Sequence, residues 1–337
     1  MPDGVAFSTA IQTPRLFHSN VGDVKGGSLR LDQFGIPVPN SGNFAVVFQS
    51  EWKDRNYALR CFSKPAIDQD ERLHEIMAHL KSNPSGYFVA FEYYPQGLLV
   101  DGQWQPLMIM EWKDGVPFEK HVQSLLNSSE GLLNLAGDWV DMFEYLRSID
   151  LAHGDIHSDN VIVENGQLVL IDYDAIYIPK LDGRTIQEAG QRNFQHPGRN
   201  QSHYGPYMDH FPSWVVYFSL ILLSVQPDLW DEFDGGDQKL LFSVDDYKNP
   251  DRSKLFSLLE TSKIAIFPLI ARELKSFLAM DIRNVPPLSR HIIKAGGLPL
   301  PPQPALWWVN SQVSSDWYRD HLDQQTKKPR LPWPPKS

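Results

Sequence analysis

Two polar runs separated by an apolar hairpin pattern limit the choice of fold for this chain more than any other feature. Residues 153–160 read His-Gly-Asp-Ile-His-Ser-Asp-Asn, and residues 172–174 read Asp-Tyr-Asp. The apolar stretches between them flank an Asn-Gly pair at 165–166, a dipeptide typical of the two-residue turn of a β-hairpin. The sequence therefore predicts a tight hairpin with a polar run on each side. Taken one at a time, these polar residues could equally cap turns.

The order of the two runs resembles the protein-kinase superfamily, in which a catalytic loop H-R-D-x-x-x-x-N precedes a D-F-G triplet. Here Asp172 follows Asp155 by 17 residues. The resemblance implies that Asp155 orients the attacking hydroxyl and that Asn160 and Asp172 are oxygen ligands of magnesium beside the ATP phosphates. Asp155, Asn160 and Asp172 are thus the predicted catalytic residues, and ATP and Mg²⁺ are the predicted cofactors.

The first third of the chain has the pattern of a small β-sheet with one helix. Residues 29–62 are strand-like with a glycine-containing turn, and their last strand is expected at 57–62. An acidic start at 68–71 predicts a helix. Two further strands are expected at 87–93 and 107–112. The helix is supported by apolar residues at helical spacing, namely Leu73, Ile76, Met77 and Leu80.

The remainder of the chain predicts a larger, mostly helical unit. Apolar spacing indicates a long helix through 135–146, and the chain is expected to be helical over most of 209–295. The apolar stretch 214–225 is too short to cross a bilayer and suits a buried helix. We therefore expect an α+β fold, bilobal and protein-kinase-like, with a small antiparallel β-sheet lobe carrying one helix and a large α-helical lobe. The expected divisions are an extension (1–28), a small lobe (29–111), a large lobe (112–298) and a Pro/Trp-rich tail (299–337).

The resemblance also implies where the phosphates of the nucleotide lie. Residues 40–47 align with the phosphate loop G-x-G-x-x-G-x-V but keep only its middle glycine. Gly42, Asn43 and Phe44 are therefore the candidates for phosphate contact through backbone amides. An ordinary hairpin turn explains the same residues equally well.

Arg60 stands at the lysine position of the kinase V-A-I-K motif, which here reads Tyr-Ala-Leu-Arg. Arginine keeps the positive charge, but its planar fork is not equivalent to an ammonium group. The family partner of that lysine is a helix glutamate, for which Glu75 is the candidate. On a helical wheel Glu75 lies away from the apolar stripe, so a solvated carboxylate is the alternative.

Three further segments align with kinase positions. The strand ending in Met110, Glu111 and Trp112 resembles the one that borders the adenine, although a plain core strand has the same pattern. Residues 193–197 align with the end of the activation segment. Asp209 resembles the aspartate that braces the catalytic loop from below, a role compatible with capping the following helix.

The composition restricts partners and compartment. A formal net charge of −10 argues against a general binder of nucleic acid or of anionic membranes, because both are captured mainly by Lys and Arg. The one cysteine, Cys61, excludes an intramolecular disulfide and favours a reducing compartment. Residues 1–20 lack the pattern of a secretory signal. We therefore expect a cytoplasmic protein that binds neither membrane nor nucleic acid.

Three functions fit these residues. A divergent serine/threonine protein kinase is favoured by the segment between Asp174 and Asp209, and it would have a protein substrate or a regulatory partner. A small-molecule kinase is the first alternative, because His157 gives the loop an H-G-D-x-H form. A pseudokinase scaffold that binds nucleotide or partners without turnover is the second, supported by Arg60 and the incomplete glycine loop. The residues do not predict an oligomeric state.

Overall fold

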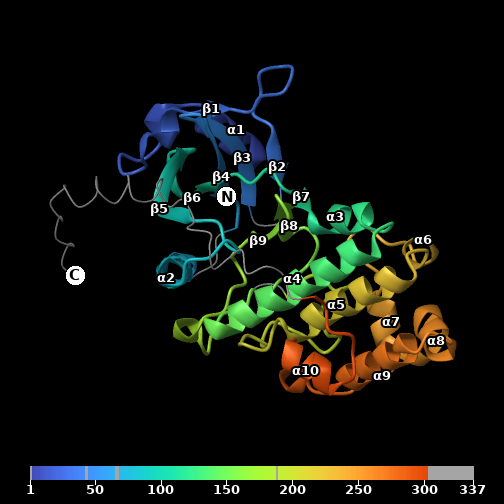
Figure 1. Cartoon of the computed structure of the whole chain (residues 1–337). Helices are drawn as coiled ribbons and strands as arrows, with labels where there is room; N and C mark the ends of the chain where they lie inside the picture. The colour runs from blue at the N-terminus through green and yellow to red at the C-terminus, as the bar shows by residue number, and fades with distance from the viewer. Residues whose placement is uncertain (1, 42–44, 65–67, 187–188, 303–337) are drawn as a thin grey trace.

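The computed structural model describes residues 2–41, 45–64, 68–186 and 189–302. It is a mixed α+β structure in which an antiparallel sheet and a group of helices form two adjoining parts (Figure 1). This confirms the predicted α+β class and its antiparallel sheet. The Pro/Trp-rich tail beyond residue 302 lies outside the described residues, as do the predicted phosphate-loop residues 42–44.

The main sheet is antiparallel throughout and has the order β1-β3-β4-β6-β5, with β2 also paired to β3. Two of its hairpins have turn residues with left-handed backbone, Lys53-Asp54 and Asp101-Gly102, as type I′ turns require. The strands are β1 (Ser28–Leu29), β2 (Pro39–Ser41), β3 (Ala45–Trp52), β4 (Arg55–Phe62), β5 (Phe91–Val100) and β6 (Gln103–Glu111).

The strand expected at 87–93 differs from the structure, where β5 begins at Phe91 and continues to Val100. Residues 87 and 88 instead contact Leu170, in the smaller sheet described below: the Leu170 amide donates to the Tyr87 carbonyl over 2.8 Å, and Phe88 forms a parallel bridge with Leu170. The apolar residues 87–89 therefore lie at the junction between the two parts of the molecule. A strand-like sequence pattern does not distinguish this position from one within the main sheet.

Two helices cover opposite faces of the main sheet. Helix α1 (Gly4–Ile11) packs on the face that carries Leu59 and Cys61 of β4, whereas α2 (Gln69–Ser82) packs on the face that carries Ala58 and Phe62. Alternation along β4 therefore turns Arg60 toward the α2 face. Residues 2–28, which fall in the segment expected as an extension (1–28), thus supply a helix and further segments to the core of the sheet.

The other part of the molecule is built around two long helices, α4 (Ser129–Ser148) and α5 (His210–Val225). The Trp139 indole N–H of α4 donates to the Ser213 carbonyl of α5 over 3.0 Å. As expected from its composition, α5 is buried almost all round. Further helices are α3 (Phe118–Ser124), α6 (Leu229–Glu232), α7 (Val244–Lys248), α8 (Lys254–Thr261), α9 (Ile266–Leu278) and α10 (Arg290–Ala295). Short 3-10 turns occur at Pro14–Leu16, Asp23–Gly26, Pro179–Leu181, Pro250–Arg252 and Ile282–Asn284.

The predicted hairpin is present between the two polar runs. It consists of β8 (Val161–Glu164) and β9 (Gln167–Leu170), and β7 (Val116–Pro117) pairs with β8 to complete a three-stranded sheet. Asn165 and Gly166 have φ angles of 51° and 78°, the backbone that an Asn-Gly turn favours. Figure 1 shows this small sheet between the main sheet and the helices.

Within the described ranges, no helix combines the length and the apolar content that a membrane crossing needs. The start of the tail lies against the helices, since the Tyr217 hydroxyl donates to the Pro299 carbonyl and Arg290 donates to the Pro301 carbonyl over 3.1 Å.

Candidate functional site

A cleft of about 1020 Å³ lies between the main sheet and the helical part. This volume is at the upper end of the ~300–1,000 Å³ usual for a small-molecule site, which is large enough for a nucleotide. Its wall brings together residues that are far apart in the sequence. Eight of the sequence-predicted or aligned positions line it: Asn40, Arg60, Met110, Glu111, Trp112, Asp155, Asn160 and Asp172.

The loop that carries Asp155 is held from behind by Asp209, at the start of α5. One carboxylate oxygen of Asp209 accepts from the His153 amide and the other from the Gly154 amide, the latter over 2.8 Å. The carboxylate is not used to cap α5. This confirms the predicted bracing. Gly154 is required here, because its φ is 83° and a Cβ would lie 2.4 Å from the Ala175 carbonyl oxygen.

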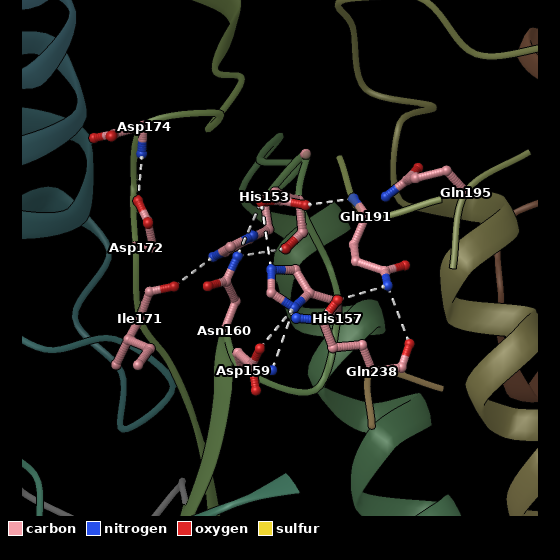
Figure 2. A network of polar contacts seen from close by, with 12 residues as sticks. His153, His157, Asp159, Asn160, Ile171, Asp172, Asp174, Gln191, Gln195 and Gln238 are labelled. Carbon is pink, nitrogen blue, oxygen red and sulfur yellow. Dashed lines mark hydrogen bonds and ion pairs between the residues drawn. The ribbon is translucent and has the colours of Figure 1, made fainter. Parts of the chain in front are cut away.

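Asp155 is fixed by three neighbours. The Asn160 amide nitrogen donates to its carbonyl over 2.9 Å and to its Oδ2 over 3.1 Å, and the Gln191 backbone amide donates to Oδ1 over 3.2 Å. The imidazole of His157 lies 3.5 Å from Oδ2. Figure 2 shows His157, Asn160 and Gln191 close together within this network of polar contacts.

Charge keeps Asp155 ionised. Burial alone would raise the pKa of its carboxyl, but the neighbouring His157 and His153 outweigh it and hold that pKa below its usual value. For His157, burial would lower the pKa, but the carboxylates of Asp155 and Asp159 raise it above its usual value. An ionised carboxylate that is held in place can accept a hydrogen bond from an alcohol hydroxyl.

Arg60 reaches from β4 across the cleft to the second polar run. Its Nη1 donates to Asp172 Oδ1 over 2.9 Å, and its Nη2 donates to Asp172 Oδ2 over 3.3 Å and to Asp174 Oδ2 over 2.6 Å. The side chain of Arg60 is only 8% exposed, whereas those of Asp172 and Asp174 are 41% and 36% exposed. The guanidinium is thus buried, and the carboxylates keep a face toward the cleft.

The predicted pairing of Arg60 with Glu75 is wrong. The Glu75 carboxylate accepts from Lys180 over 2.7 Å, and it is absent from the lining of the cleft. The reason is the rotation of α2: Leu73 and Ile76 are buried, which turns Glu75 away from β4. The alternative of a carboxylate on the outer surface was the correct interpretation.

Asn160 and Asp172 suit a magnesium ion by their chemistry. Because the Asn160 amide nitrogen donates to Asp155, its amide oxygen is the atom available to a cation, and Asp172 adds carboxylate oxygens. Magnesium typically takes one or two protein oxygen ligands and completes its shell with phosphate and water. The described part of the chain holds no cluster of three His, Cys, Asp or Glu side chains suited to a metal. The site therefore offers a cation the oxygens of two side chains and leaves the rest of its shell to water or phosphate.

One end of the cleft is apolar. Val47, Ala58 and Met110 line it from the main sheet, whereas Ile162 of β8 and Ile171, which directly follows β9, line it from the other side. Glu111 and Trp112 follow at the rim, where the Trp112 amide donates to the Asn56 carbonyl over 2.9 Å. A flat aromatic ring between two apolar walls, with backbone polar groups at its edge, would fit this end.

Sequence reasoning missed three residues of the site. Asp174 carries the shortest contact of Arg60. Gly190, with a φ of 81°, lies over Asp155: a Cβ there would be 2.9 Å from Asp155 Oδ1 and 2.7 Å from Gln195 Nε2. That amide nitrogen of Gln195 is buried and has no partner among the described residues. The signal for Asp174 was the acidic residue at the glycine position of D-F-G, whereas Gly190 and Gln195 depend on tertiary contacts.

Comparison of the chain with protein-family models and with curated proteins finds no match.

Proposed function

We propose that this chain is a divergent protein-kinase-like phosphotransferase that binds ATP and Mg²⁺ in the cleft and transfers the γ-phosphate to a hydroxyl group. The observation that carries the proposal is the meeting of Asp155, Asn160 and Asp172 on one wall of a cleft, opposite the cation Arg60. Phosphoryl transfer requires positioning and charge neutralisation more than covalent help from the protein, and these groups supply both.

The proposed roles follow from the contacts. Asp155, kept ionised by its neighbours, accepts the hydrogen bond of the attacking hydroxyl. The Asn160 amide oxygen and the Asp172 carboxylate would hold magnesium, which neutralises charge on the phosphates. The apolar end between Ala58 and Ile162 would hold the adenine. In this proposal the main sheet with α2 and the helical part are the two lobes of a kinase-like fold.

We favour a protein serine or threonine hydroxyl as the acceptor and the cytoplasm as the compartment. The long segment between Asp174 and Asp209 supports a protein acceptor, because its Gln191 amide binds Asp155 and would form part of a docking surface. A small-molecule acceptor is the second candidate. It is supported by His157, which lies 3.5 Å from Asp155 and occupies the position, two residues after the loop aspartate, where a serine/threonine kinase would have a lysine.

A scaffold without turnover is the third candidate. Its support is the guanidinium of Arg60, which bonds to both carboxylate oxygens of the proposed metal ligand Asp172. The intact Asp155, Asn160 and Asp172 set supports the catalytic proposal over it.

The test is transfer of label from γ-phosphate-labelled ATP by the purified chain with Mg²⁺. Two acceptor panels, proteins with exposed Ser/Thr hydroxyls and small polyols or amino alcohols, are run side by side. We expect label in one panel, and autophosphorylation counts as a protein acceptor. The contrary result is binding of ATP without its cleavage in the presence of either panel, in an assay where a control kinase is active. It would contradict phosphate transfer and favour the scaffold function.

A further inference from the structure

The side chain of Arg60 is shared unequally between two carboxylates. Asp172 receives two hydrogen bonds, of 2.9 and 3.3 Å, whereas Asp174 receives a single shorter one of 2.6 Å. The Nε–H of Arg60 is buried and has no acceptor among the described residues. The guanidinium therefore has no carboxylate partner beyond these two in the part of the chain that is described.

Helix α2 offers no carboxylate to Arg60. The α2 side chains that line the cleft are Gln69, Arg72 and Leu73. Asp68, just before the helix, accepts from Arg72 over 3.3 Å and from Arg184 over 2.7 Å. Asp174 is therefore the group that can keep Arg60 paired when Asp172 is engaged elsewhere.

The backbone holds the two carboxylates side by side. Asp172 has a φ of 66°, a left-handed conformation that Asp tolerates better than most residues, and the Asp174 amide donates back to Asp172 Oδ1 over 3.3 Å. Between them, the Tyr173 hydroxyl accepts from the Val89 amide over 2.7 Å and is buried, so the turn is anchored to the segment that precedes β5. This turn is not free to carry Asp174 away from Arg60.

We propose that Asp174 is a positioning residue that retains Arg60 while Arg60 and a divalent cation compete for Asp172. The inference rests on the proposed function, because that function assigns Asp172 to the cation. A buried guanidinium left without a carboxylate is strongly unfavourable. When the cation takes the oxygens of Asp172, Asp174 keeps a carboxylate paired with Arg60 and so holds the guanidinium in the wall of the cleft.

The experiment is Mn²⁺ binding without nucleotide, followed by the paramagnetic resonance signal of the free ion. Arg60→Gln removes the competitor and should tighten binding about tenfold, whereas Asp174→Asn should weaken it about tenfold. Asp159→Asn is the matched control. It removes a carboxylate that also lines the cleft and is 57% exposed, whereas the carboxylates that Arg60 binds among the described residues are those of Asp172 and Asp174, so it reports the effect of charge alone.

The double variant R60Q/D174N decides between two roles of Asp174. If Asp174 acts by retaining Arg60, the second substitution changes Mn²⁺ affinity in the Arg60→Gln background no more than Asp159→Asn does. If Asp174 is itself a metal ligand, Asp174→Asn lowers the Mn²⁺ affinity by the same factor in the Arg60→Gln background as in wild type. That result would contradict the proposal.

Two further outcomes of the Mn²⁺ titration bear on the competition between Arg60 and the cation. Wild type that binds no Mn²⁺ while Arg60→Gln does would support the competition in its strongest form. Binding by neither protein, with both folded by circular dichroism, would overturn it. Because the assay contains no ATP and measures no transfer, its outcome is independent of whether phosphate transfer occurs in the separate labelling experiment.

Discussion

Asp155→Asn should lower the rate of γ-phosphate transfer by about 10³-fold, within the ~10²–10⁴ range of a positioned general base. The substitution removes the negative charge that would accept the hydrogen bond of the acceptor hydroxyl, while the amide oxygen that replaces Oδ1 can still accept from the Gln191 amide. The dissociation constant of ATP should change by no more than about twofold, because in the proposed arrangement Asp155 contacts the acceptor hydroxyl and not the nucleotide. Initial rates and calorimetric binding measure the two quantities.

Asp159→Asn is the control for this prediction as well. Asp159 follows in the same loop, and the contact of its carboxylate within the described part of the chain is a distant one, 4.0 Å from His157. It should retain transfer within a few-fold of wild type, as expected of an exposed surface charge. Equal rates of phosphate transfer by wild type and Asp155→Asn would show that Asp155 has no role in the transfer step.

Asp209→Ala should lower the free energy of unfolding by about 2–5 kcal/mol, the sum expected for two buried amides that lose a charged acceptor. Asp209 is 4% exposed, and both of its carboxylate oxygens accept from the loop, one from His153 and one from Gly154. Without them, these amides face a buried site with no acceptor. Urea unfolding followed by circular dichroism measures the loss.

Asp228→Ala is the matched control. Asp228 is also the residue that precedes a helix, α6, and it makes no side-chain capping bond, but it is exposed. We expect a change within about 0.5 kcal/mol for this substitution, as for surface positions in general. A loss of the same size in both variants would mean that the contact of Asp209 with the loop contributes little.

Local patterns were sufficient to predict the elements that frame the site. The hairpin β8–β9 was predicted from its Asn-Gly turn, and α2 from an acidic start and apolar positions at helical spacing. Both signals are contained within a few residues. The bracing by Asp209 was predicted from the resemblance and is confirmed by its bonds to His153 and Gly154.

The pairing of Arg60 could not be predicted in the same way. Its partner depends on how far α2 rotates on the sheet and on which carboxylate the turn after β9 presents, and both are tertiary properties. The sequence offered Glu75 at a suitable distance along the chain, but burial of Leu73 and Ile76 fixes the helix with Glu75 outward, on Lys180. Asp174 lies 114 residues from Arg60, and only the folded chain shows their contact.

The packing of residues 2–28 could also not be predicted from local patterns. Helix α1 has a mixed sequence, and its cap, Asp3, which accepts from the Val5 and Ala6 amides, is an ordinary one. That Phe7 and Ile11 complete the core on the outer face of the sheet follows from the alternation of β4, which leaves Leu59 and Cys61 to be covered.

The central claim is that the cleft between the main sheet and the helices binds ATP with magnesium, and calorimetric titration of ATP tests it most directly. We predict one ATP per chain with a dissociation constant in the ~1 µM–1 mM range in Mg²⁺. Ala58→Phe, which fills the apolar end, should abolish this binding while the protein stays folded. No binding by folded wild type at millimolar ATP, or equal binding by Ala58→Phe, would contradict the account.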